Sequence, residues 1–206
     1  MTLAILWFWI IAALWGGYFL LEGFDFGVGI LLPFLGRRQD ERRVLLDTIA
    51  PVWDGNEVWL VIAAGATFAA FPAWYATMFS GFYLLLLLVL VLLIVRAVSF
   101  EWRGRSAGPR SRGAWQWANT IGSFGAPFIW GLVLANLLHG VPLDGKGHFS
   151  GSLGDLFSAY TVLAGLATVG LFALHGATFL TLRTTGASLE RATRAARRLS
   201  IPVTIV

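Results

Sequence analysis

Four carboxylates lie inside apolar stretches of the chain, where they could move protons or ions. Glu22 and Asp25 lie in the first stretch, and Asp54 and Glu57 lie in the second, and the members of each pair are three positions apart in the chain. An ionisable side chain at membrane depth is costly unless it is neutralised, paired or hydrated. Because residues three apart share one face of a helix, each pair predicts a proton-handling site.

Three further polar residues are candidates for the same site. Asn56 lies between the second pair of acids and can orient water for proton exchange between them. Arg96 ends a third apolar stretch and is the expected charge partner, and His175 lies deep within a later stretch. We expect Asn56 and His175 to line a cavity that faces the cytoplasm, and an isolated imidazole predicts no metal site.

Two other interpretations of these charges stay open. The acids can pair with Arg96 and serve only to lock the helices together in a structural assembly subunit. A proton-coupled secondary transporter would also carry buried acids and glycine-broken helices, but it commonly gathers its polar residues at the membrane midplane. In this chain the polar residues gather toward one side, which favours a narrow proton path.

Composition indicates an integral membrane protein. The 206 residues are 57% hydrophobic and 13% charged, and the apolar runs exceed the roughly 20 residues that span a bilayer. The chain has no cysteine, which excludes thiolate-held iron–sulfur clusters and cysteine-based zinc sites. The net charge of +4 comes from basic residues in short connections, so we expect no nucleic-acid partner.

The apolar stretches predict an all-α, polytopic transmembrane bundle. We expect residues 1–139 to form a four-helix transmembrane unit and residues 140–155 to form an outer loop. Residues 156–206 would begin a second helical unit, with a basic inner loop at about 183–199. The predicted spans cover 3–32, 50–71, 79–98, 114–138 and 156–182, and a sixth begins near Ile201.

Arginines cluster in three connections and predict the orientation of the helices. Four lie within 37–43, five within 96–112 and five within 183–198. The positive-inside rule places these connections in the cytoplasm and the N-terminus outside. At 1.5 Å per residue, Asp25 lies about 12 Å and Asp54 about 6 Å from the inner edge, so both acid pairs fall at similar depth.

Several segments resemble subunit II of the cytochrome bd-type quinol oxidases. The most specific is IAPVWDGNEVWL, which begins at Ile49. In GFDFGVG, Gly23 and Gly27 form a small-xxx-small arrangement that lets another helix approach closely. The others are LGRR and ERR in the first basic connection, FSGFY from Phe79, SFEWR from Ser99, IGSFGAP from Ile121, NLLHGVP from Asn136 and GATFLTLRTTG from Gly176.

This resemblance implies a respiratory complex in the cytoplasmic membrane of a bacterium or archaeon. Such a complex oxidises quinol and reduces dioxygen to water with protons taken from the cytoplasm. The resemblance implies that haem d and two b-type haems belong to the partner, subunit I, and that this chain supports that partner without holding haem itself. A quinone or lipid bound as a structural element is common in the family, and a small accessory subunit stays open.

The resemblance also implies roles for the charged residues. Asp54 is the first acid of a proton route toward the haems, and Asp25 matches a second family acid. Glu57 stands where members vary between acid and amide, Glu22 where the position can be uncharged, and Arg96 matches an arginine that tunes or anchors the acids. Members usually carry a second helical half after the first, so we expect this chain to be partial.

Overall fold

The chain folds into helices over almost all of its length. The computed structural model describes residues 2–106 and 108–205. The predicted all-helical fold is confirmed, and β pairing among these residues is limited to a single bridge between Leu143 and Phe149. The elements are α1 (Leu3–Leu35), α2 (Gln39–Asp47), α3 (Trp53–Ala70), α4 (Pro72–Gly81), α5 (Tyr83–Arg105), α6 (Pro109–His139), a 3-10 turn η1 (Leu153–Leu156), α7 (Ala159–Arg183) and α8 (Gly186–Ile205).

Four helices in the described part of the chain are long and apolar enough to cross a membrane: α1, α5, α6 and α7. The second predicted span corresponds to α3, which has 18 residues and is not among the four. It carries Asp54 and Glu57 in its first two turns. These acids reduce the mean hydropathy of an already short helix.

Three segments differ from what the sequence predicts. The first basic connection contains α2, and α4 begins with Pro72, a residue that suits the first helical position because no helical N–H is needed there. The segment 183–199, expected as a basic inner loop, is instead helical from Gly186 onward. Alanine, leucine and arginine dominate this segment, and all three are strong helix formers.

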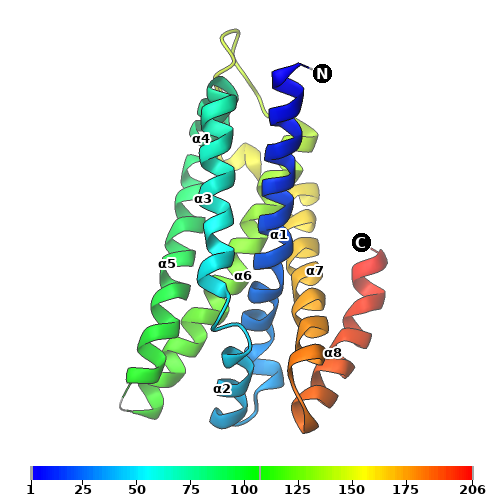
Figure 1. Cartoon of the computed structure of the whole chain (residues 1–206). Helices are drawn as coiled ribbons and strands as arrows, with labels where there is room; N and C mark the ends of the chain where they lie inside the picture. Colours follow the sequence, from blue (N-terminus) through cyan, green and yellow to red (C-terminus); the bar gives the residue numbers. More distant parts are fainter. Residues whose placement is uncertain (1, 107, 206) are drawn as a thin grey trace.

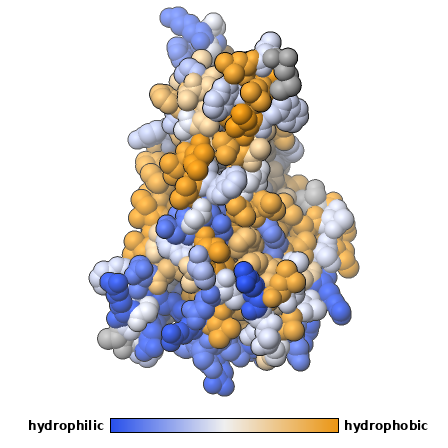
Figure 2. Space-filling view, in the orientation of Figure 1, coloured by the Kyte–Doolittle hydropathy of each residue, from blue (hydrophilic) through white to orange (hydrophobic). Residues whose placement is uncertain are grey.

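The long helices alternate in direction around α1 (Figure 1). Helices α1, α5 and α7 run away from the end where the N-terminus lies, and α3 and α6 return. Helix α1 packs against α3, α6 and α7, while α5 packs against α6. The arginine-rich connections meet at the end opposite the N-terminus. Figure 2 shows hydrophilic side chains at this end and at the opposite tip, with a largely hydrophobic surface between them.

Glycines bring the backbones of α1 and α7 into contact. A Cβ atom built on Gly27 would lie 2.7 Å from the Gly176 Cα, and one built on Gly176 would lie 2.6 Å from the Gly27 Cα. Such an approach requires that neither residue has a side chain. With this face of α1 held against α7, Glu22 and Asp25 face α3 and α5 on the other side.

Gly176→Leu should destabilise the protein because its side chain would meet the backbone of α1. We expect a loss of about 1–3 kcal/mol or more, measured as a lower midpoint of thermal unfolding in detergent. Gly65→Leu is the matched control, since a Cβ at Gly65 meets no atom within 4 Å. Equal midpoints for the two variants would contradict the backbone contact.

A charged contact joins α2 to α8. The Glu41 carboxylate forms an ion pair with Arg191 at 2.9 Å and accepts hydrogen bonds from the backbone N–H groups of Arg37 and Arg38 at 2.8 and 3.2 Å. These donors, Arg191 foremost, lower the pKa of Glu41 from 4.5 to about 2. The contact therefore persists well below neutral pH.

The Glu41 contact predicts an acid transition at this end of the bundle. Because the folded pKa lies below the unfolded value, the contact stabilises the fold above about pH 4.5 and is lost as the pH falls through about 2. After correction for intrinsic exchange, the amides of Arg37 and Arg38 should stay protected near pH 4 and lose protection toward pH 2. Glu41→Gln should remove this transition, and loss of protection already near pH 4.5 would refute the lowered pKa.

Candidate functional site

Helix α1 carries a polar stripe into the middle of the bundle. Tyr18, Glu22 and Asp25 are spaced by four and three residues, which places them on one helical face. All three side chains are fully buried. The helix that crosses the centre of the fold therefore carries two buried carboxyl groups and, one turn before them, a phenol whose ring packs against Trp130 of α6.

Arg96 on α5 lies between the acids of α1 and α3. Its Nη1 donates to Glu22 Oε1, and it also donates to Glu57 Oε1 at 2.9 Å. Its Cζ lies 4.8 Å from the ring centroid of Phe26 and 5.4 Å from that of Phe100, so the cation also contacts two aromatic faces. One guanidinium thus joins three helices.

Asn56 provides the contact between α3 and Asp25. Its Nδ2 donates to Asp25 Oδ2 at 2.7 Å and lies 3.4 Å from the Leu21 carbonyl oxygen. Asn56 and Asp25 are both buried. The residues Glu22, Asp25, Asn56, Glu57 and Arg96 therefore form one contiguous group, which we call the Arg96 cluster.

Several polar atoms of the Arg96 cluster have no hydrogen-bond partner in the described part of the protein. They are Glu22 Oε2, Asp25 Oδ1, and Nε and Nη2 of Arg96, together with the neighbouring Tyr18 hydroxyl. Buried polar groups are normally hydrogen-bonded to protein or to internal water. The arrangement is therefore suited to a few internal waters that connect the carboxyl groups.

Asp54 lies at the edge of this site. It is an exposed residue in the first turn of α3 and lies three positions before Glu57, which puts the two acids on one side of the helix. The Glu57 side chain is 21% exposed, whereas those of Glu22 and Arg96 are fully buried. Glu57 therefore connects the exposed acid with the interior.

His175 is not part of the Arg96 cluster. It is half-buried on α7, where its ring packs edge-to-face on Phe24 with 5.7 Å between ring centroids. This placement differs from the expected lining of an acid-bearing cavity. A membrane haem needs His or Met ligands that face its cavity. His175 packs against Phe24 and Met78 lies in the hydrophobic core, so these two residues do not face a common cavity as a pair of axial ligands.

Tyr18, Phe26 and Phe100 complete the surroundings of Arg96, although sequence reasoning did not select them. Tyr18 lies four residues before Glu22, and Phe100 lies four residues after Arg96. Helical spacing alone could have identified both as neighbours. Phe26 follows Asp25 directly, and no comparable signal indicates that its ring contacts the guanidinium.

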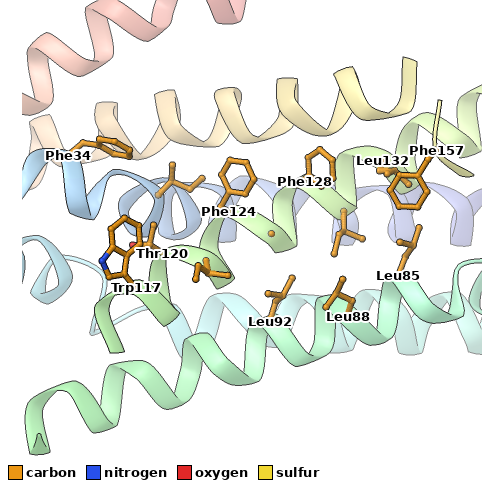
Figure 3. A pocket seen from close by; sticks show the side chains of 14 residues that line it. Phe34, Leu85, Leu88, Leu92, Trp117, Thr120, Phe124, Phe128, Leu132 and Phe157 are labelled. Atoms are coloured by element: carbon orange, nitrogen blue, oxygen red, sulfur yellow. The ribbon is translucent and has the colours of Figure 1, made fainter. Parts of the chain in front are cut away.

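An apolar groove runs along α5 and α6, away from the Arg96 cluster (Figure 3). It encloses about 650 Å³. Leu85, Leu88 and Leu92 line one wall, while Phe124 and Phe128 line another. Apart from Thr120 and Trp117, the residues that line this groove are apolar.

Arg96→Met should strongly destabilise the bundle because it removes the cation shared by Glu22 and Glu57. Breaking a buried ion pair from one side costs about 3–5 kcal/mol, measurable as a change in the free energy of unfolding. Arg105→Met is the control: its pair with Glu101, at 3.1 Å, is exposed, and its loss should cost less than about 1 kcal/mol. Similar losses in the two variants would contradict a central role for Arg96.

Comparisons with known proteins agree on one family. A family model described as cytochrome bd terminal oxidase subunit II matches residues 3–206. Subunit 2 of the cytochrome bd ubiquinol oxidase of Bacillus subtilis is 44% identical over 194 residues, covering 94% of this chain and 57% of that protein. Subunit 2 of the Escherichia coli K12 cytochrome bd-I ubiquinol oxidase is 42% identical over 209 residues, covering 100% of this chain and 55% of that protein.

A solved structure supports the fold. The bd oxidase from Geobacillus thermodenitrificans contains a chain that matches with a TM-score of 0.78 at 22% identity, covering 98% of this chain and 62% of that one. The chain spans somewhat more than half the length of the curated relatives it matches. On the family match and these identities, the chain belongs to the cytochrome bd terminal oxidase subunit II family.

Proposed function

We propose that the chain acts as subunit II of a membrane quinol:oxygen oxidoreductase. In this role it supports a haem-bearing subunit I and supplies part of a cytoplasmic proton pathway for the reduction of dioxygen to water. Family membership supports the assignment to the complex. The observation that supports the proton pathway is the Arg96 cluster, in which one guanidinium is bonded to Glu22 and Glu57 and Asn56 is bonded to a third acid, Asp25.

The charge balance of the Arg96 cluster favours proton exchange. One ionised carboxylate neutralises Arg96, and each further ionised carboxylate would be a buried negative charge without a matching cation. The carboxyl groups of Glu22, Asp25 and Glu57 are therefore suited to sharing protons among themselves. A proton that arrives at one carboxyl group can be balanced by release from another, so the cluster can pass protons onward.

The exposure of the four acids indicates where protons would enter the Arg96 cluster. Asp54 is exposed and Glu57 is partly exposed, whereas Glu22 and Asp25 are fully buried. Protons would pass from Asp54 to Glu57 and then to the buried acids. The arginine-rich end of the bundle lies on the cytoplasmic side by the positive-inside rule, with the N-terminus outside.

The redox chemistry belongs to the partner in this proposal. Haem d and two b-type haems, together with quinol oxidation, are assigned to subunit I, as the resemblance to the family implies. When bound there, the haems supply electron transfer and oxygen reduction. This chain binds the partner and holds and transfers protons at the carboxyl oxygens of the Arg96 cluster.

Asp25→Asn in the assembled oxidase is the direct test of the proton pathway. The amide keeps the size of the side chain but cannot exchange a proton, so we expect oxygen consumption to fall roughly tenfold or more while haem content is unchanged. Asp54→Asn should show the same pattern with a smaller loss. Glu101→Gln, an exposed acid on α5 paired with Arg105, is the control and should keep full turnover.

The outcome separates the pathway from a structural lock. Unchanged oxygen consumption in Asp25→Asn, with haem retained, would remove this acid from the pathway. Loss of haem or of the partner subunit would instead indicate that the Arg96 cluster only holds the helices together. The haem content is measured from the reduced-minus-oxidised visible spectrum of the complex purified through a tag on this chain.

A further inference from the structure

A second set of buried polar residues lies on α6, outside the pathway described above. Gln116, Asn119 and Ser123 are spaced by three and four residues and share one face of the helix. They are 4%, 1% and 0% exposed. Over seven residues this stripe rises about 10 Å from the arginine-rich end toward the level of Arg96.

The lower end of the stripe reaches the surface through α2. Gln116 Oε1 accepts from Arg42 Nη1 at 2.7 Å, and Gln116 Nε2 donates to Gln39 Oε1 at 2.6 Å. Gln39 is exposed. A cavity of about 30 Å³ opens beside this contact and is lined in part by Arg42, Gln116 and Thr120. A polar cavity of this size can hold one or two waters.

The middle of the stripe reaches the backbone of Arg96. Asn119 Nδ2 donates to Ser99 Oγ at 3.0 Å, and the Ser99 hydroxyl donates to the Arg96 carbonyl oxygen at 2.6 Å. Both side chains are almost fully buried. The amide of Asn119 therefore lies one helical turn from the guanidinium-bearing residue of the proposed pathway.

The upper end of the stripe lies beside α1, one turn below Asp25. A Cβ built on Gly29 would lie 3.0 Å from Asn119 Oδ1 and against the Ser123 hydroxyl, so both polar groups face this glycine. Gly29 follows Asp25 by four residues, on the same helical face. The stripe and the buried acid are thus aligned along α1.

Two polar atoms of the stripe have no partner in the described part of the protein. Asn119 Oδ1 and Ser123 Oγ are buried without a hydrogen bond, as is Asp25 Oδ1 above them. Polar contacts that only joined helices would satisfy these atoms with protein groups, as Thr120 does by donating to the Gly29 carbonyl at 3.1 Å. Buried oxygens that lack a protein partner instead match the needs of bridging water.

We propose that Gln116, Asn119 and Ser123 form a hydrated polar column that delivers protons from the α2 surface to Asp25. This column is a second route into the Arg96 cluster, parallel to the route through Asp54 and Glu57, and it rests on the proposed function. Protons move between neighbouring waters held by the amide and hydroxyl groups. Each water that passes a proton onward receives another from below, so no net charge stays on the column.

The first test is a density map of the unmodified, full-length oxidase at a resolution that shows ordered water. The expected result is at least one ordered water bonded to Asn119 Oδ1 or Ser123 Oγ, in a row that continues toward Asp25. A dry contact between α1 and α6 at these oxygens would overturn the column. This measurement does not depend on the folding of any variant.

The second test measures proton uptake by the assembled oxidase with a pH indicator after mixing with oxygen. The double variant Asn119→Leu/Ser123→Ala should about halve the uptake rate, because one of two parallel routes is closed. When this double variant is combined with Asp54→Asn, both routes are impaired at once. The uptake rate should then fall by a larger factor than the product of the two factors measured separately, as expected for residues that do not act independently. Thr178→Val, which removes an exposed hydroxyl bonded only within α7, is the control.

The outcomes separate this column from the pathway on which it rests. One outcome is that Asp25→Asn slows proton uptake, while the α6 double variant has the same uptake rate as Thr178→Val, both by itself and when each is combined with Asp54→Asn. In that case the column is refuted and the proposed pathway stands. If Asp25→Asn leaves uptake unchanged, the proposed pathway fails, and the column has no acceptor. If the uptake rate of the combined variant fell only by the product of the factors for the α6 double variant and for Asp54→Asn, the two sets of residues would act independently. That result would also refute two parallel routes.

Discussion

The buried guanidinium of Arg96 is the interaction on which the rest of the structure depends. It is fully buried and is shared by Glu22 on α1 and Glu57 on α3. A buried charge is tolerated only when it is paired and hydrogen-bonded, so the three helices must keep the geometry that provides those partners. The same arrangement gives the acids a common cation. The Arg96 side chain therefore both joins the three helices and provides the cation that pairs with the acids.

Close helix contacts make this geometry attainable. Gly27 and Gly176 let α1 lie directly against α7, and Gly122 lets α6 approach the α5 backbone at Arg96. Side chains at these positions would push α1 or α6 away and lengthen the polar contacts across the bundle. Because polar contacts weaken steeply with distance, the glycines and the charged residues depend on each other. The packing of α1 on one face positions its acids on the other.

Much of the fold and part of the site were predictable from sequence. The apolar stretches predicted the all-helical bundle, because the length and composition of a membrane-spanning helix are local properties. The spacing of Glu22 and Asp25 predicted a shared face for the same reason. Sequence could not reveal that Asp54 is exposed or that His175 packs on Phe24. Those placements depend on how each helix is rotated against its neighbours.

The sequence by itself determined that ionisable groups lie within apolar helices and that the arginine-rich connections alternate along the chain. Both follow from residue order, since hydropathy and helical period need no tertiary contact. Only the tertiary structure decided that Arg96 serves two acids, that Asn56 binds Asp25, and that the polar face of α6 is aligned with α1. The physical reason is that hydrogen bonds act over about 3 Å, a distance set by the rotation and close approach of helices that are far apart in the sequence.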